Sequence, residues 1–136
     1  MSAADEARRN ANRVVGGDVN KLMRALALEA QSRVMQKTPV DTGRARANWN
    51  VSINTPDTST NEGATSAQVA AKQNEGRQVI ARADFMDGDD LYVTNGLPYI
   101  KALEDGHSQQ APRGMVKLTA RELKPLVEQI ARRFGA

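Results

Sequence analysis

The chain has 136 residues, a length that fits one domain with a single modest core. Aromatic residues make up only 4% of it, so the core must be built from aliphatic side chains. The 19 Lys and Arg residues against 16 Asp and Glu give a net charge of +3, and this balance argues against a dedicated nucleic-acid-binding module, which needs a concentrated basic face.

Cysteine is absent, which excludes a disulfide framework, a thiolate metal site and a cysteine nucleophile. No apolar run approaches the roughly 18 residues that a membrane span needs. The N-terminal sequence also lacks the apolar centre of a secretory signal. We therefore expect a protein that is made in the cytoplasm and has no membrane partner.

The first part of the chain is expected to contain a long helix. Residues 1–17 are polar with poor periodicity, and they are expected to form either a flexible arm or a helix. Asp18 is a candidate N-cap for the helix that follows. Thr38-Pro39 is expected to end this helix, because the residue before a proline disfavours the helical region. The helix is indicated by apolar residues at three- and four-residue spacing: Val19, Leu22, Met23, Leu26, Ala27, Ala30 and Val34.

A turn and a strand are expected next. Asp41-Thr42-Gly43 has the composition of a turn, because Asp and Thr side chains bond nearby N–H groups and Gly tolerates a positive φ. From Ala47 to Ile53 apolar and polar residues alternate, which predicts a half-buried strand with one apolar and one polar face. Trp49 lies on the apolar side, so we expect it in the core rather than on a base-stacking surface.

The middle of the chain is predicted to be a loop followed by a helix. Residues 55–66 contain no large apolar side chain, so they are expected to form an exposed loop that the fold can lose. Residues 67–83 are predicted to be helical, with Gly76 as a potential break.

The last part predicts a short strand and two helical pieces. Leu91–Thr94 is the strand, and Pro98–Leu103 is a short helical turn with Gly106 near its C-cap. Met115–Phe134 has helical spacing, and Pro125 is expected to kink or divide it. The predicted fold class is α+β, with a long N-terminal helix and a C-terminal helix packed on a small antiparallel sheet of two to four strands.

Three positions are candidates for chemical sites. Asp41-Thr42-Gly43 is the tripeptide of aspartic proteases, but that chemistry needs a second carboxylate sharing a proton. His107 is the only histidine and lacks the additional ligands or base–orienter pair that metal or triad chemistry needs. Glu104 is expected to accept backbone N–H bonds from the loop 108–113, or to pair with Arg44 or Arg46.

Two stretches are dense in backbone-setting residues: TPVDTGRARANW at Thr38–Trp49 and LYVTNGLPYIKALEDGHSQQAPRGMV at Leu91–Val116. In this order they resemble the two signature blocks of the HK97 gp10-like family of phage tail components. The matching positions that we expect to have a structural role are Pro39, Asp41, Thr42, Gly43, Arg44, Trp49, Asn95, Pro98, Tyr99, Glu104, Gly106, Ser108, Gln110, Pro112 and Gly114.

The resemblance implies a structural protein of a phage or prophage virion that does no covalent chemistry and needs no cofactor or metal. It implies a head–tail joining or tail-completion role, with subunits in a ring, six in number by analogy with tail symmetry. The partners would be the head connector or stopper and the tail terminator or tube, with genomic DNA passing through unbound. The alternatives are a tail terminator or other minor tail protein, an aspartic-type hydrolase built on Asp41, and a nucleic-acid-binding module.

Overall fold

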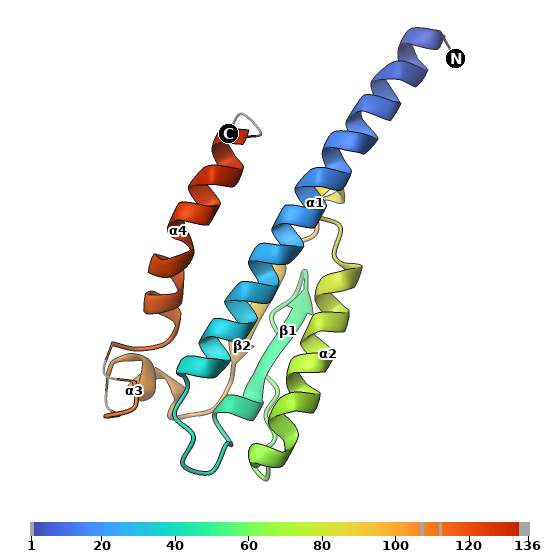
Figure 1. Ribbon diagram of the computed structural model, residues 1–136. Coiled ribbons are helices and arrows are strands. Elements are labelled where there is room, and N and C mark those ends of the chain that lie inside the picture. The colour runs from blue at the N-terminus through green and yellow to red at the C-terminus, as the bar shows by residue number, and fades with distance from the viewer. Residues whose placement is uncertain (1, 107, 112, 134–136) are drawn as a thin grey trace.

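The computed structural model describes residues 2–106, 108–111 and 113–133, and for residues 5–18 and 133 it describes the backbone alone. In this part of the chain four α-helices pack with one two-stranded antiparallel sheet, so the predicted α+β class is confirmed (Figure 1). The sheet has the smallest number of strands that the sequence predicted.

Helix α1 spans Ala3–Lys37 as one element, longer than the sequence predicted. The prediction of an N-cap at Asp18 is wrong, because the helix continues through Gly16-Gly17. Glycine weakens a helix interior by about 1 kcal/mol relative to Ala, which does not by itself end it. The predicted end before Thr38-Pro39 is confirmed. There the Arg46 guanidinium donates to the carbonyls of Gln36 and Thr38, at 2.9 and 3.0 Å, and so satisfies carbonyls that the helix end leaves free.

The sheet pairs β1 (Trp49–Ile53) with β2 (Leu91–Asn95), in a register that sets Trp49 opposite Asn95 and Ile53 opposite Leu91. Trp49 is 3% exposed, as predicted for a core residue. It packs in a cluster with Val34, Met35, Ala111 and Met115. Its indole Nε1 donates to Thr38 Oγ1 at 2.8 Å, so the one polar atom of the ring is satisfied inside the core.

Helix α2 (Val69–Arg82) packs against β1 and α1, and a 3₁₀ turn at Ser66–Gln68 leads into it. The prediction that Gly76 breaks this helix is wrong: Gly76 lies in its interior and is buried. A buried glycine inside a helix marks a close approach of neighbouring elements, and here those elements are α1 and β1.

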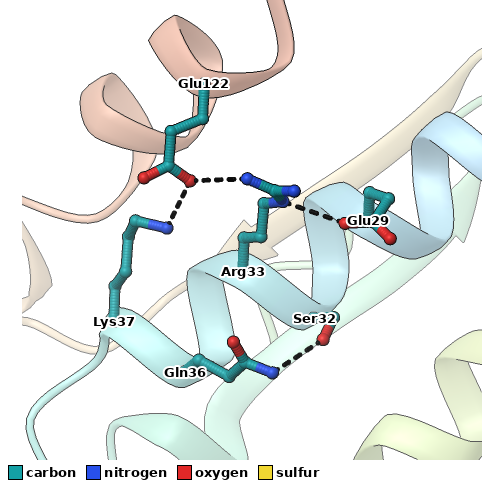
Figure 2. Close-up of polar contacts among 6 residues, drawn as sticks. All are labelled: Glu29, Ser32, Arg33, Gln36, Lys37 and Glu122. Atoms are coloured by element: carbon teal, nitrogen blue, oxygen red, sulfur yellow. Dashed lines mark hydrogen bonds and ion pairs between the residues drawn. The ribbon is translucent and has the colours of Figure 1, made fainter. Parts of the chain in front are cut away.

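Helix α3 (Ile100–Glu104) is short, and α4 (Val116–Arg133) runs beside α1 (Figure 1). Of the two predicted effects of Pro125, a kink or a division of the last helix, division does not occur, because α4 continues through Pro125. Ion pairs hold α4 against α1: Glu122 Oε1 lies 2.7 Å from Lys37 Nζ and 3.0 Å from Arg33 Nη1. Figure 2 shows these contacts. Arg33 is positioned in turn by Glu29 on the same helix, at 2.9 Å.

Two asparagines of the predicted polar side are not open to water, contrary to what alternation suggests. Asn48 lies in a 3₁₀ turn (Arg46–Asn48) that precedes β1, where a strand was predicted, and Asn50 lies in β1, whereas Asn54 is exposed as predicted. Asn48 and Asn50 are 2% and 3% exposed. Asn50 Nδ2 donates to the carbonyls of Asp57 and Ser59, both at 2.8 Å. Asn48 both donates to Asn61 O and accepts from Asn61 N. Residues 55–63 are exposed, as predicted. The loop 55–66 nevertheless supplies carbonyl partners to these two buried amides, which the prediction that the fold can lose the loop did not include.

Candidate functional site

The two sequence blocks meet in one place, which we call the junction: the turn 38–45, the segment 95–104 and the segment 108–117. The side-chain amide of Gln110 is one of the links between the two blocks. Gln110 Nε2 donates to Asp41 Oδ1 at 2.8 Å, and Gln110 Oε1 accepts from Val40 N at 3.0 Å. Because both ends of the amide are used, the orientation of Gln110 is fixed by the turn.

The turn itself depends on Gly43, whose φ of +79° favours glycine. A Cβ at this position would lie 2.4 Å from the backbone N of Ser66. That N–H donates to Thr42 O at 3.1 Å, so the end of the loop 55–66 rests on the turn. Thr42 Oγ1 accepts from Arg44 N, which confirms the predicted turn chemistry.

Asn95 and the residues after it connect the sheet to the turn. Asn95 Nδ2 donates to Ala45 O at 2.9 Å, and its Oδ1 accepts from Leu97 N at 3.2 Å. Pro98 is exposed and lies two residues before α3 rather than at its first position. Tyr99 precedes α3 directly and is 37% exposed.

Glu104 caps the last helix. Its Oε1 accepts from the backbone N of Met115 and Val116, and its Oε2 from that of Lys117, at 2.8 to 2.9 Å. Burial raises the pKa of this carboxyl, but the three N–H donors together with the Lys117 charge outweigh it, so the pKa lies below its ordinary value. Glu104 does accept backbone N–H groups, but the prediction that they come from the loop 108–113 is wrong: the donors, Met115, Val116 and Lys117, follow it.

The suggested pairing of Glu104 with an arginine is wrong. Arg46 is engaged at the end of α1, and Arg44 lies 3.8 Å from Glu62 of the loop 55–66. Both arginines therefore serve the first block and the loop rather than the cap of α4.

Two glycines give the second block its shape. Gly106 follows α3 with φ +89°, as its predicted place near a C-cap suggests. Gly114 has φ +83°, and a Cβ there would lie 2.4 Å from Glu104 O. Between them Ser108 accepts from Gln110 N through its hydroxyl, which sets the loop that presents Gln110. Pro112 and His107 lie outside the described residues.

A hollow of about 310 Å³ opens at the junction. Tyr99, which lines the hollow, is 37% exposed, and Val40 of the same turn is 42% exposed. Among the residues that line the hollow, Asp41 is the only carboxylate. A shared-proton pair of carboxylates is therefore not formed there. The residues that line it are Pro39, Asp41, Thr42, Gly43, Arg44, Ala45, Tyr99 and Leu103.

The described residues contain no group of three or more His, Cys, Asp and Glu side chains placed to hold a metal ion. In the same part of the chain no helix is both long and apolar enough to cross a bilayer.

Sequence reasoning missed several residues that hold the junction together. The Thr38 hydroxyl accepts a hydrogen bond from the Trp49 indole, and Arg46 donates to a carbonyl at the end of α1. Asn48 and Asn50 bind the loop 55–66. A run of asparagines on the polar side of a strand was the available signal, because Asn is depleted in ordinary strands and its amide suits a segment that needs backbone partners.

The chain matches no protein-family model, and no curated protein or solved structure shows significant similarity to it.

Proposed function

We propose that this protein is a structural component of the neck of a tailed phage or prophage, where it joins the head connector to the tail as one subunit of a ring around the DNA channel. It does no covalent chemistry and works through its surfaces. The subunits of such a ring meet through different patches on their two sides, because a head-to-tail contact that closes gives a ring.

One observation carries this proposal: the two blocks of the family resemblance, separated by about 40 residues of sequence, are bonded to each other in space through Gln110, Val40 and Asp41. If the two blocks lay in separate parts of the fold, their residues could not contribute to one shared surface. Here they meet at one junction, where the apolar side chains of Val40 and Tyr99 are partly exposed. An exposed face with a fixed backbone is suited to contact with another protein.

The distribution of charge supports a protein that lets DNA pass through a channel rather than one that binds nucleic acid tightly. Basic side chains in the described residues lie beside acidic ones, for example Lys72 with Glu75, Lys101 with Asp105 and Lys124 with Glu128. A protein that grips DNA gains affinity by neutralising many phosphates with unpaired cations. Interspersed charges let DNA pass without strong retention.

The hydrolase alternative has less support. The carboxylate of Asp41 accepts a hydrogen bond from Gln110, and no second carboxylate lines the hollow. The structural role of Asp41 in the turn explains why the residue is there without any catalytic function.

The test is genetic and structural. In the phage or prophage that encodes this chain, deletion of the gene should give filled heads and finished tails that do not join, and expression of the wild-type chain should restore infectious particles. Imaging of those particles without imposed symmetry should place a ring of this protein between head and tail, with six copies expected.

A matched control is a deletion strain complemented by the Lys124→Gln variant, which alters an exposed side chain (74% exposed) far from the junction. It should assemble normally. A protein absent from the finished particle, or present as one copy, would contradict the proposal.

A further inference from the structure

We propose that residues 3–17 of one copy, here called the N-terminal segment, dock in a groove between α1 and β2 of a neighbouring copy. This inference rests on the proposed ring and names the contact that closes it. The groove, here called the α1–β2 groove, is bounded by α1 on one side and by Phe85 and β2 on the other.

The N-terminal segment extends from the body of its own subunit. Figure 1 shows the first turns of α1 continuing beyond the ends of α2 and α4. The side-chain contacts described between α1 and other elements begin at Asn20, which bonds to Asp84 and to Phe85 N. An isolated helix of this length is only marginally stable in water. A partner surface would therefore add to the stability of this segment.

The sequence of the segment suits a shallow apolar groove with acidic edges. Ala4, Ala7, Ala11 and Val14 recur at three- and four-residue spacing, which places them on one face of the helical backbone. Their side chains are small, so a helix carrying them can approach a surface closely. The segment carries three arginines against Asp5 and Glu6, a net charge of +1. The two acidic residues lie in its first turn, so residues 7–17 carry only positive charge.

The α1–β2 groove has the complementary properties. Its volume is about 570 Å³, and its floor includes Met23 and Leu26 of α1, Phe85 and Leu91. The charged residues among those that line it are Asp89 and Asp90, both acidic. Asp89 is held by Asn54 and by the backbone N of Asp84, whereas Asp90 is exposed at the edge.

An amphipathic helix that lays its apolar side in a groove is a recurring mode of protein recognition. In this case the apolar side carries Ala and Val, and Arg8 follows Ala7 at the border of the stripe, where it can meet Asp90 of the neighbour. Opposite charges at the rim of such a contact favour the correct partner and orientation. A second copy of this chain is therefore the occupant that the charge pattern fits.

The contact cannot form within one chain. Ala11 and Ala30 belong to the same helix, and 19 residues of α-helix separate them by about 28 Å. The N-terminal segment and the groove are thus different patches of one subunit, so their contact is head-to-tail and generates a ring or an open chain.

Disulfide trapping tests this directly, because the chain has no native cysteine. The variant Ala11→Cys/Ala30→Cys carries one thiol on the segment and one on α1 at the groove. A bridge needs Cα atoms within about 7 Å, so any disulfide between the two positions must join two copies. Purified full-length protein at high concentration is oxidised and separated under denaturing, non-reducing conditions.

The expected result is a ladder of covalent species above the dimer. The matched control is Ala11→Cys/Gln78→Cys, in which the second thiol lies on the exposed side of α2; it should give no such ladder. The single-cysteine variants can give at most dimers. Circular dichroism on each variant establishes that it is folded before it is oxidised.

Charge reversal provides the second measurement. Arg8→Glu and Asp90→Arg should each slow cross-linking, by up to roughly fivefold for an exposed ion pair, and the combination of the two should restore much of the rate. Absence of the ladder in a folded Ala11→Cys/Ala30→Cys variant overturns the inference, whether the protein is monomeric or oligomeric. A ring seen in particles whose subunits fail to cross-link would leave the proposed function standing and refute only this interface.

Discussion

The side chain of Gln31 fills the space that glycine leaves open at Gly76. A Cβ on Gly76 would lie 1.9 Å from Gln31 Nε2, and that same nitrogen donates to Gln73 O at 3.0 Å. Gln31 is fully buried. The pair explains why α2 retains a glycine in its interior: the missing side chain lets α1 and α2 come together around one buried amide.

We expect Gly76→Ala to destabilise the protein. In an unhindered helix this change is stabilising by about 1 kcal/mol, but here the new methyl group would also meet Val51 Cγ2 at 2.8 Å. Overpacking of a core costs about 1–3 kcal/mol, so the net effect should be a lower free energy of unfolding. Urea denaturation measures it.

Gly63→Ala is the control for this change. At Gly63 the nearest atom to a new Cβ is Asn61 Oδ1, at 3.6 Å, an ordinary contact. The urea concentration at the unfolding midpoint of Gly63→Ala should stay close to that of the wild type. Equal behaviour of the two variants would show that the space around Gly76 is not filled as described.

Loss of the Glu104 carboxylate should weaken the start of α4. Glu104→Gln replaces one accepting oxygen by an NH₂ group that faces N–H donors, so we expect a loss of about 1–2 kcal/mol of unfolding free energy, the size of a helix-cap deletion. Glu75→Gln on the exposed surface is the matched control, since Glu75 is 71% exposed and 3.6 Å from Lys72. Chemical denaturation at neutral pH compares the two.

The same carboxylate should give the protein a pH dependence. Its pKa is lowered in the folded state, so the unfolded chain takes up the proton first as the pH falls. The stabilisation by Glu104 is therefore complete above the ordinary value of 4.5 and is lost as the pH drops through the folded pKa. The difference in stability between wild type and Glu104→Gln should shrink in that range; a difference that is constant down to strong acid would contradict the cap.

Shortening of the loop 55–66 should destabilise the fold. If residues 56–62 are replaced by a short Gly-Ser link, the buried amides of Asn48 and Asn50 lose carbonyl partners. A buried donor left unsatisfied costs about 1–3 kcal/mol. Thermal unfolding should show a lower Tm, whereas Thr60→Ala, which keeps the loop backbone, should not. A shortened variant that melts like the wild type would mean that water replaces the loop at no cost.

The contact between Gln110 and the turn should matter more than the charge on Asp41. Asp41→Asn keeps an oxygen that can accept from Gln110 Nε2, so stability should change by less than about 0.5 kcal/mol and assembly of particles should persist. Gln110→Ala removes both bonds of the amide and should cost about 1 kcal/mol. A peptidase activity of the wild type that disappears in folded Asp41→Asn would refute the structural role.

Local sequence signals predicted the elements that depend on local chemistry. The helix end before Pro39, the turn at Gly43 and the core position of Trp49 follow from backbone preferences and alternation, and the structure has all three. The errors at Gly76 and along the polar side of β1 have a different origin. In each, a side chain or loop distant in sequence supplies the partner, and local patterns contain no information about such partners.

The same limit applies to the junction. Its members could be recognised as backbone-setting residues, but the pairing of Gln110 with Asp41 spans 69 positions and no spacing rule predicts it. The cap that Glu104 places on α4 was partly foreseen, because a carboxylate near a Gly-rich turn commonly accepts N–H groups. Its actual donors, Met115 to Lys117, follow from the positive φ of Gly114, which directs the chain back over Glu104.

Pro125 gives α4 two halves that differ in their local stability against unwinding. Proline has no N–H to bond to the carbonyl of Arg121, and the fastenings of this helix, the cap at Glu104 and the bridge at Glu122, both lie before it. Amide hydrogens after Pro125 should exchange with solvent deuterium sooner than those between Lys117 and Lys124, because the far half can unwind while the near half stays closed. The last two turns of the helix would then be free to rewind against a neighbour without disturbing the core.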